Sequence, residues 1–583
     1  MLMDEVPQTS RWKFALFVSV IAVVVTAVCT YPLIFNWQTH VPGFKFADSF
    51  NHAWFAWWFD FAIFKLEQSP AELTYLFHPI YVEHPLLTAM AWSRFMPMLA
   101  IHFGSSLTAT YNAHIFISYV LTWLFSSLLI LELTNHKATA IVAGAIFAFF
   151  PNRTMHVLYG HYTQQITYQY PLLVWMLWRV WQRPSWQRGI WLGVALTLAA
   201  IVDLMPLAYF AAPVTLLLLL YFFFSDRQRF LSRPMLIALG TAFGIAALVV
   251  IPLIWPLFNT AIQDDLTWYQ SGGVAEFSAD GLALFVPPPG HILTRASQQL
   301  YTFSDNIHNW GYSASEAQVY AGWITLVLAS IGLWRERHRT LSVGFWFLIA
   351  LATAILALGP ILRLGGQIQL WAGDRYIFLP YFLATKIPFL EWGRTPARLH
   401  FTTMFALMIL AGYGLRYVLT RWKRPLAQAV VATAVLALIL VDSTFQTSWP
   451  LLSTEIPPYM SEIAADSRAV AVLDIPVNNY RGEKYYMLYQ TVHQHPIVGG
   501  HAYRTPQEIV DLRQEIVTDL TTQETISTLI QNNIGYVVLH HTIEDEAGII
   551  QPITSVLQAE IGQPEYQDEL ITIFFIPNTE ETE

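Results

Sequence analysis

An acidic and an imidazole side chain stand four residues apart in the stretch GFKFADSFNHAWFAWW, residues 43–58. On a helix, Asp48 and His52 would share a face. A carboxylate in this setting can accept the proton of a hydroxyl group or bind a metal ion. A structural role is the alternative, because Asp directly before a helix is a preferred N-cap residue. The two roles are compatible, and the sequence leaves both open.

A second polar stretch is FFPNRTMHVLYGHYTQQITYQYP, residues 149–171. It carries Arg153, His156, His161 and Gln164 where an ordinary connector would have Gly, Ser and Asp. A guanidinium group matches the geometry of phosphate, and imidazole and amide groups can hydrogen-bond to hydroxyl groups. We therefore expect a pocket wall that binds phosphate or sugar hydroxyls. The alternative is a polar loop whose histidines form hydrogen bonds within the protein.

Three basic residues, Lys386, Arg394 and Arg398, occur in LPYFLATKIPFLEWGRTPARLHF, residues 379–401. The two arginines flank Pro396 at the start of a predicted helix, and a helix N-terminus also favours an anion. We expect these cations to bind the phosphate or diphosphate of a lipid-linked substrate. Lipid headgroups are the alternative ligand.

Further polar residues give weaker signals. Asp203 follows a predicted helix on the same side and is expected to line the same cavity. Glu316 is expected to cap the helix that begins after it. His493, His495 and His501 in TVHQHPIVGGHAYR could bind a metal, but an HxH spacing is more typical of surface or loop histidines.

The composition is that of a membrane protein. Of 583 residues, 55% are hydrophobic and 12% are charged, and the mean hydropathy is +0.42. A soluble domain carries about 25% charged residues. The net charge of −9 provides no basic face, which argues against nucleic acid as a partner. Cys29 is the single cysteine, which excludes intrachain disulfides and multi-thiolate metal sites.

Apolar segments of suitable length predict about 11 transmembrane helices. The first is too long for a signal-peptide core and is expected to be retained. Lys and Arg residues occur at every second joint, which places the N-terminus in the cytoplasm if residues 85–103 do not cross the membrane. We therefore expect 85–103 to lie at the outer face. The predicted spans are 14–35, 108–133, 138–151, 167–182, 189–203, 206–224, 234–258, 317–334, 341–360, 396–418 and 426–444.

This orientation places the long loops and the C-terminal part outside the cytoplasm. The predicted membrane domain covers residues 1–445, with outer-face loops at 36–107, 152–166, 259–316 and 361–395. In the first loop, Trp54, Trp57 and Trp58 favour a helix at the membrane interface. Residues 446–583 are predicted to form an extracytoplasmic α/β domain with buried strands at 469–476, 534–541 and 570–577. Amphipathic helices are predicted between the first two of these strands, at 506–520 and 522–533.

These motifs together resemble the GT-C superfamily of membrane glycosyltransferases, in particular its large group of bacterial polytopic relatives. The resemblance covers most of the chain, although each motif is short. The motifs are D-x3-H (Asp48, His52), FxP (Phe77, Pro79), FPNRxxH-x4-H (Phe150 to His161), E-x3-Y-x-G (Glu316, Tyr320, Gly322) and P-x5-R-x3-R (Pro388, Arg394, Arg398). The resemblance implies transfer of a sugar from a polyprenyl-phosphate donor, with the first-loop Asp acting as a base or organising a metal.

One departure from the superfamily pattern concerns metal binding. Many members carry a second acidic motif after the third helix, but no acidic residue lies between Asn152 and Gln169. A divalent metal, Mg²⁺ or Mn²⁺, is therefore not required by the sequence. If one binds, the expected ligands are Asp48, His52, His156 and His161.

The functional hypothesis is a multi-pass glycosyltransferase of the plasma membrane and cell envelope. Asp48 would deprotonate an acceptor hydroxyl, on a glycan or a protein, and Arg153, Arg394 or Arg398 would stabilise the departing phosphate. Membrane lipids and the lipid-linked donor are the expected partners. A non-catalytic membrane scaffold that displays the C-terminal domain is the alternative, because the second acidic motif is missing. A transporter is disfavoured, because the predicted spans are nearly free of charged residues.

Overall fold

The computed structural model of the chain describes most of its length. The described residues are 8–577, apart from 81, 85, 90–91, 264–272, 310–313, 337–340, 372, 374, 388–389, 391–392, 446–447, 503–504, 506, 522–524 and 547.

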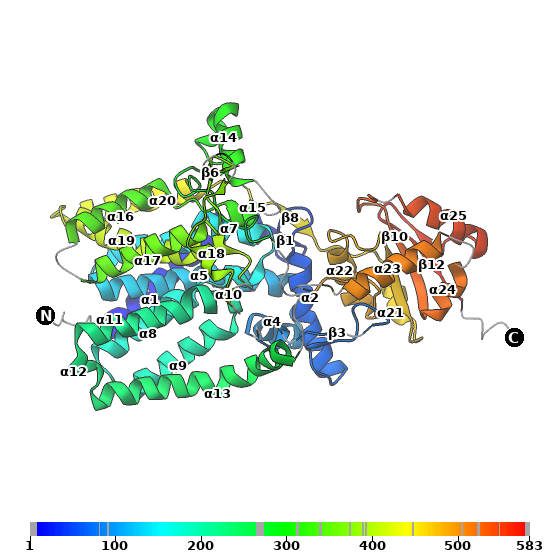
Figure 1. The fold of residues 1–583 in the computed structure, drawn as a ribbon, viewed down its shortest axis with the longest axis horizontal. Helices are drawn as coiled ribbons and strands as arrows, with labels where there is room; N and C mark the ends of the chain where they lie inside the picture. Colours follow the sequence, from blue (N-terminus) through cyan, green and yellow to red (C-terminus); the bar gives the residue numbers. More distant parts are fainter. Residues whose placement is uncertain are drawn as a thin grey trace.

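Long apolar helices run side by side along the molecule and form its larger part (Figure 1). A helix overlaps each of the eleven predicted spans. These helices are α1 (Gln8–Cys29), α5 (Leu107–Thr134), α6 (Lys137–Ala148), α8 (Gln169–Gln182), α9 (Trp186–Ile201), α11 (Ala212–Ser225), α13 (Arg233–Gln263), α16 (Trp323–Glu336), α17 (Leu341–Ala357), α19 (His400–Leu419) and α20 (Pro425–Ser443).

Length and composition identify six of the described helical segments as candidate membrane spans: Arg11–Cys29, Leu107–Thr134, Leu204–Ser225, Arg233–Thr260, Pro396–Leu419 and Pro425–Ser443. A seventh arises if α6 and α7 (Pro151–Leu158), which are bent by 42°, form one broken span. The others are short. At 14 residues, α8 is about 21 Å long, whereas the hydrocarbon core is roughly 30 Å thick. The chain is thus a mostly helical membrane protein with at least six candidate spans.

The joints that carry basic residues gather at one end of the bundle. Arg11 of α1 lies 3.4 Å from Glu132 of α5, and Arg229 of α12 (Arg227–Phe230) donates to the carbonyl of Gln182. Figure 1 shows α12 and the N-terminus at this end and the C-terminal part of the chain at the other.

The loop between α1 and α5 fills the boundary between the bundle and the C-terminal part. It contains β1 (His40–Pro42), α2 (Ser49–Asp60), β2 (Glu72–Leu73), β3 (Val82–Glu83), α3 (Leu86–Ala89) and α4 (Trp92–His102). With 11 residues α4 is too short to cross a bilayer, which agrees with the prediction that 85–103 does not span.

The indoles of α2 are not at a lipid surface. Trp54 and Trp58 are fully buried and stack with ring centres 5.4 Å apart, and Trp57 is 8% exposed. The predicted interfacial role of these three residues is wrong. Their helix is enclosed by α4, α5 and the C-terminal part, and the Trp54 N–H donates to Gln490 Oε1 at 2.8 Å.

A four-stranded mixed sheet organises the C-terminal part, in the order β11-β12-β10-β9. Its two central strands, β12 and β10, are buried on both faces along almost their whole length, as their apolar runs predict. One face packs on α21 and α22, and the other packs on α23, α24 and α25. The elements are β8 (Leu451–Ser453), α21 (Met460–Ala465), β9 (Ala471–Ile475), α22 (Glu483–His493), α23 (Gln507–Leu520), α24 (Thr525–Gln531), β10 (Ile534–His540), α25 (Ile550–Glu560), β11 (Tyr566–Gln567) and β12 (Ile571–Phe575).

The C-terminal part is fastened to the loop between α1 and α5 by backbone pairing and by a shared core. β1 pairs antiparallel with β8, and Ile497 N donates to the Tyr75 carbonyl at 3.0 Å. One cluster of buried hydrophobic residues continues from the bundle through α2 to α22 and the sheet. This junction fixes residues near position 48 against residues near position 484.

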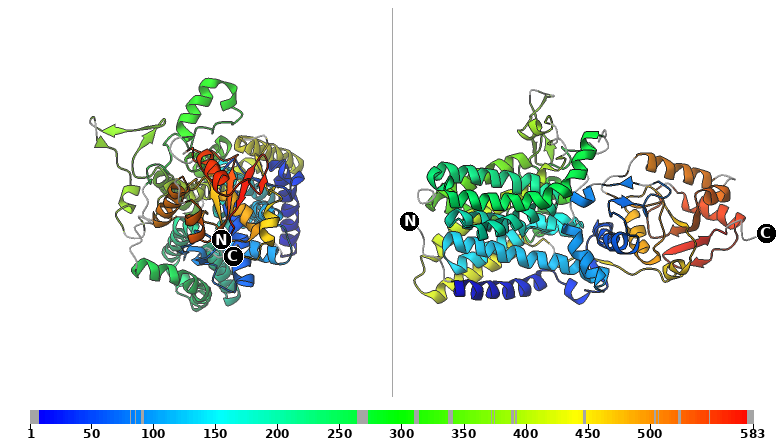
Figure 2. Two further views of the ribbon diagram at one scale, coloured as in Figure 1. Left: turned by 90° about the vertical axis from the view of Figure 1, so that its right-hand side faces the viewer. Right: turned by 90° about the horizontal axis from the view of Figure 1, so that it is seen from below.

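Two other segments project from the side of the bundle (Figure 2). They are α14 (Gln298–His308), which is followed by α15 (Ala314–Ala317) back at the bundle, and a pair of hairpins followed by α18 (Tyr381–Ala384). The hairpins are β4–β5 (Arg363–Leu364 with Gln367–Ile368) and β6–β7 (Leu370–Trp371 with Arg375–Tyr376).

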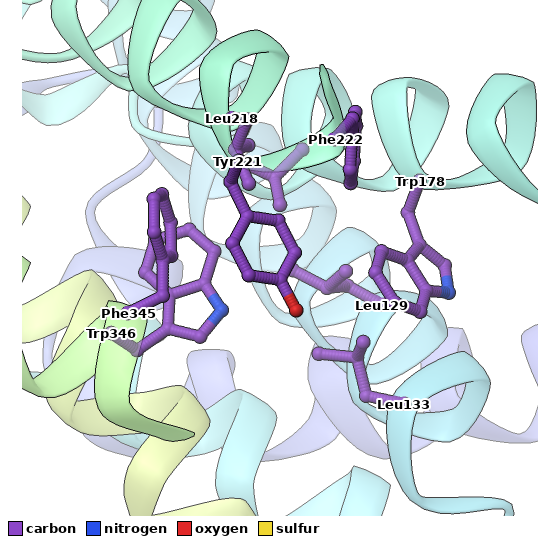
Figure 3. A pocket seen from close by; sticks show the side chains of 9 residues that line it. Leu129, Leu133, Trp178, Leu218, Tyr221, Phe222, Phe345 and Trp346 are labelled. Atoms are coloured by element: carbon purple, nitrogen blue, oxygen red, sulfur yellow. The ribbon is translucent and has the colours of Figure 1, made fainter. Parts of the chain in front are cut away.

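An apolar pocket lies between α5, α8, α11 and α17 (Figure 3). Its lining residues are Leu129, Leu133, Val174, Trp178, Leu218, Tyr221, Phe222, Phe345 and Trp346. It contains none of the predicted site residues and belongs to the interior of the bundle.

Candidate functional site

Asp48 stands at the start of α2, but its carboxylate does not cap the helix. It occupies the N-cap position and makes no hydrogen bond to the amides of the first turn. Its Oδ1 instead lies 2.5 Å from Lys484 Nζ and accepts a hydrogen bond from the Tyr480 hydroxyl at 3.0 Å. The side chain is 17% exposed. The carboxylate is therefore directed toward ionisable groups at the edge of the junction.

A close backbone approach aligns Asp48 with the loop that follows α7. Asp48 N donates to the Tyr159 carbonyl at 2.9 Å, and Gly160 has a φ of +75°. A Cβ at Gly160 would collide with the backbone of Asp48 and Ser49. Only glycine meets both requirements at this position.

Helix α7 carries His156 and the loop after it carries His161, and the two predicted histidines are in contact with each other and with an acid. His156 Nδ1 and His161 Nδ1 are 2.8 Å apart, and His161 Nε2 lies 3.7 Å from Asp48 Oδ2. Glu316 of α15 lies 3.8 Å from a nitrogen of each histidine. Asn152, which donates to the Ser315 carbonyl at 2.8 Å, holds α15 against α7.

Glu316 forms a buried ion pair with Arg398. Arg398 Nη2 lies 2.5 Å from Glu316 Oε1, and its Nε donates to both carboxylate oxygens at 2.9 and 3.1 Å. Glu316 is 2% exposed. The prediction that Glu316 caps the following helix is wrong, because α16 begins only at Trp323.

The remaining predicted basic and polar residues lie at different depths. Gln164 donates to Asp203 Oδ2 at 3.2 Å, and both Gln164 and Arg398 line a small pocket with Tyr170, Met205, Pro206, Tyr209 and Phe401. Asp48 is not among the residues that line it. Arg394 is half-buried, over the ring of Phe277, and Lys386 is exposed. Among the described residues, Arg394 and Arg398 thus lie toward the histidines and Glu316, whereas Lys386 does not.

Arg153 lies beneath the loop. It is fully buried, donates to the carbonyls of Gln165 and Ala148 and to Ser118 Oγ, and stacks 3.9 Å from the centre of the Tyr119 ring. In this position it ties the two ends of the loop together.

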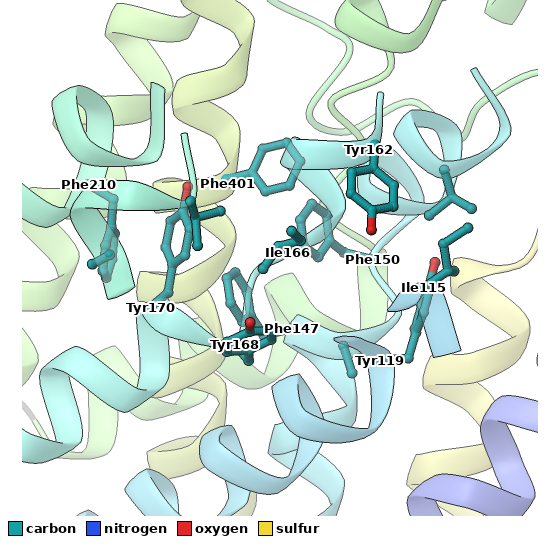
Figure 4. Packing of buried hydrophobic residues seen from close by; sticks show 14 of the residues in the cluster. Ile115, Tyr119, Phe147, Phe150, Tyr162, Ile166, Tyr168, Tyr170, Phe210 and Phe401 are labelled. Carbon is teal, nitrogen blue, oxygen red and sulfur yellow. The ribbon is translucent and has the colours of Figure 1, made fainter. Parts of the chain in front are cut away.

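Aromatic side chains form the floor under the loop (Figure 4). The ring of His52 stacks on Tyr162, one of these aromatic side chains, with the ring centres 5.8 Å apart. Burial, together with the charge of Arg94, lowers the pKa of His52 to about 3. His52 is thus a neutral ring that supports the loop beside Asp48.

Electrostatics keep the acid ionised and the imidazole neutral. Burial alone would raise the pKa of Asp48, but Lys484 and His161 together hold this pKa below its ordinary value. Burial and the neighbouring His156 lower the pKa of His161 to about 3. An ionised carboxylate therefore faces an uncharged imidazole that can accept a proton or bind a metal.

Sequence reasoning missed two side chains of the C-terminal part, Lys484 and Tyr480, and named His501 only as a possible metal ligand. Lys484, Tyr480 and His501 reach the site through the docking of α22, and burial lowers the pKa of His501 to about 4. Arg394 lies within electrostatic range of both Tyr480 and His501. A lysine and a tyrosine in the stretch NNYRGEKYY carry no spacing that would have indicated a site.

The other two histidines of the HxH stretch are structural. His495 is 8% exposed and hydrogen-bonds to the carbonyls of Val470 and Ile463, and His493 is 2% exposed. The expectation of surface or loop histidines is therefore wrong for His493, which lies buried in α22, whereas His495 lies in a loop but is buried there.

Comparisons with solved structures identify the architecture. The arabinofuranosyltransferase AftD from Mycobacteria aligns over 99% of this chain with a TM-score of 0.59 and 13% identity, and a second AftD structure aligns over 97% with a TM-score of 0.51 and 15% identity. The fold is of the GT-C type.

This chain spans about two fifths of the length of AftD, 42% and 41% in the two structures. The oligosaccharyltransferase AglB from Archaeoglobus fulgidus, in complex with an inhibitory peptide and a dolichol-phosphate, aligns over 90% of this chain and 69% of its own, with 12% identity and a TM-score of 0.49. The sequence matches no protein-family model and none of the curated proteins.

Proposed function

We propose that the chain is a glycosyltransferase of the plasma membrane that transfers a sugar from a polyprenyl-phosphate donor to a glycan or protein acceptor on the outer face. The observation that carries the proposal is the cluster of Asp48, His161, Glu316 and Arg398 at the junction of the helical bundle and the C-terminal part. The GT-C fold supports it. Asp48 of the first loop is thus joined by a second acid, Glu316, from a distant segment.

The proposed orientation follows from the basic joints. They gather at the end of the bundle away from Asp48, and Lys and Arg residues are retained in the cytoplasm. The N-terminus would then be cytoplasmic, the C-terminal α/β unit of residues 446–583 extracytoplasmic, and the eleven predicted helices would cross with short or bent members. Asp48 and Arg394 would share the outer compartment.

The chemistry assigned to the site is a single displacement. The acceptor oxygen forms a bond to the anomeric carbon of the sugar, the bond from that carbon to the phosphate oxygen breaks, and Asp48 takes the proton of the acceptor hydroxyl. The polyprenyl phosphate leaves with the electron pair. Arg394 and Arg398 would stabilise its negative charge, because preorganised cations act strongly at a buried site. Arg153 would contribute by holding the loop.

The side chains of His156, His161 and Glu316 could hold a divalent metal ion. His156 Nε2 is buried, makes no hydrogen bond to any described residue, and lies 3.8 Å from Glu316 Oε2. The candidate ligand atoms of His156, His161 and Glu316 lie within 4.8 Å of one another. Two imidazoles and one carboxylate suit Mn²⁺ or Zn²⁺ better than Mg²⁺, which prefers oxygen ligands. When bound, such an ion would neutralise phosphate charge.

The test is a transfer assay with purified protein and a panel of polyprenyl-phosphate sugars. Asp48→Asn should abolish transfer while leaving the melting temperature close to that of the wild type. Asn keeps the shape of the side chain but cannot accept the proton. Full activity of this variant at equal expression would exclude Asp48 as the base.

A non-catalytic scaffold is the second candidate. The ion pair of Asp48 with Lys484 favours it, because the pair joins the first loop to the C-terminal part. A scaffold would show no transfer with any donor, and Asp48→Asn would then weaken only the attachment of the C-terminal part.

A further inference from the structure

The C-terminal part places a buried lysine at the edge of the site. Lys484 lies in the first turn of α22, and its side chain is 2% exposed. Its ammonium group lies 2.5 Å from Asp48 Oδ1, donates to the Phe46 carbonyl at 2.7 Å, and stands 3.9 Å from the centre of the Tyr480 ring. Carbonyl, carboxylate and ring thus surround the cation.

The position of this lysine is set by a rigid interface. Gln490 lies further along α22 and accepts the Trp54 N–H at 2.8 Å, while its own amide donates to the carbonyls of Tyr75 and His495. These bonds are buried or partly buried, and they join α22 to α2 and the first loop. Lys484 is therefore delivered to Asp48 as part of the fold.

The ammonium group has capacity for a further anion. It carries three N–H donors, of which Phe46 and Asp48 occupy two directions. Asp48, at 17% exposure, and Tyr480, at 53%, separate the ammonium group from solvent, so displacement of either side chain would open it to an anion. A lysine is a point charge on a flexible stem and is a frequent ligand of phosphate.

Other cations face the same place. The charge of Arg394 acts on Tyr480 and His501, and Arg398 lies on the far side of His161 with Glu316. Among the described residues, the site thus combines three cations with two carboxylates. The resulting excess of positive charge would attract a phosphate group.

We propose that Lys484 is a ligand of the donor phosphate and that Asp48 and this phosphate compete for its ammonium group. The proposal rests on the proposed function of the site. When the phosphate takes the ammonium, Asp48 loses its closest cation and is left to accept the proton of the acceptor hydroxyl. Donor binding and the release of the base are then coupled through one side chain.

The experiment measures the binding of radiolabelled decaprenyl phosphate, without a sugar, to the full-length protein in detergent. Lys484→Met should weaken binding at least about tenfold, which is the scale of a lost charge-assisted hydrogen bond. Lys484→Arg, which keeps the charge, should recover part of the affinity. Lys45→Met is the matched control, because Lys45 is exposed and its ammonium lies 4.8 Å from the Phe46 ring. The control should bind like the wild type.

A second variant covers the risk that Lys484→Met folds poorly with an unpaired Asp48. The double variant Asp48→Asn with Lys484→Met carries no buried charge at this position, and it should bind as weakly as the single lysine variant. Binding within twofold of the wild type by both variants would overturn the assignment of Lys484. Wild-type protein that binds decaprenyl phosphate but transfers no sugar would instead refute the proposed function and leave the lysine site in place. Wild-type protein that does not bind it would overturn both.

Discussion

The ion pair of Glu316 and Arg398 offers a quantitative test of the site. Arg398→Leu removes three charge-assisted contacts and leaves a carboxylate that is 2% exposed without its cation. Breaking a buried ion pair by removing one partner typically costs about 3–5 kcal/mol. With an unfolding entropy of about 2.1 cal/mol/K per residue over 583 residues, a loss of 4 kcal/mol corresponds to a drop of roughly 3 °C in melting temperature.

The assay is thermal unfolding in detergent, followed by the exposure of Cys29 to a thiol-reactive dye, because this thiol lies within α1 of the bundle. The double variant Glu316→Leu with Arg398→Leu removes both charges and should regain most of the loss, because apolar side chains of similar volume often replace a buried pair without cost. The matched control is Arg481→Leu. It breaks a pair with a similar separation, 2.9 Å, whose side chains are 51% and 62% exposed. Exposed pairs contribute about 0–1 kcal/mol. Equal melting temperatures for Arg398→Leu and Arg481→Leu would refute the buried pair.

Two further predictions test the positioning of Asp48 and the electrostatics of the C-terminal part. Gly160→Ala should reduce transfer by roughly 10²-fold by displacing the loop from Asp48, since small misplacements at a site can cost this much. Gly104→Ala is the control, because Gly104 also has a positive φ, +92°, but no atom lies within 4 Å of the added Cβ. Equal activities of the two variants would contradict the argument. Glu483 is buried against Arg513, and burial raises its pKa from 4.5 to about 7. A raised acid pKa means that the folded state binds the proton more tightly, so stability is lost as the pH rises from about 4.5 through 7, by up to about 3 kcal/mol. Glu483→Gln should flatten this part of the profile of melting temperature against pH, whereas the exposed Glu462→Gln should leave it unchanged; a wild-type slope in Glu483→Gln would show that another group titrates.

Much of the fold was predictable because its signals are local. Apolar runs placed helices in each predicted range, and the apolar stretches after residue 468 predicted β9, β10 and β12. Of the helices between these strands, α23 and α24 were predicted, but α22 and α25 were not. The number of membrane-spanning helices could not be predicted from the sequence in the same way. Helices such as α8 are apolar but shorter than the bilayer, and hydropathy does not determine whether neighbouring helices shelter them.

The site was predictable only in part. Asp48, His156 and His161 were chosen from residue type and spacing, and they do converge. Arg153 matched phosphate chemistry equally well but lies under the loop, because a guanidinium with five donors also serves to bind backbone carbonyls. The indoles of α2 matched an interfacial helix but are covered by α22, an element more than 400 residues away in the sequence.

The sequence by itself determined a helical membrane protein with an acid after its first span, a histidine-containing loop after its third, and an α/β unit at its end. Those features depend on hydrophobicity, periodicity and residue type within short windows. Only the tertiary structure decided that Glu316 and Arg398 pair beside the histidines, and that Lys484 and Tyr480 face Asp48. Contacts between distant segments depend on how helices dock and which side chains they exclude from solvent, and no local pattern encodes that geometry.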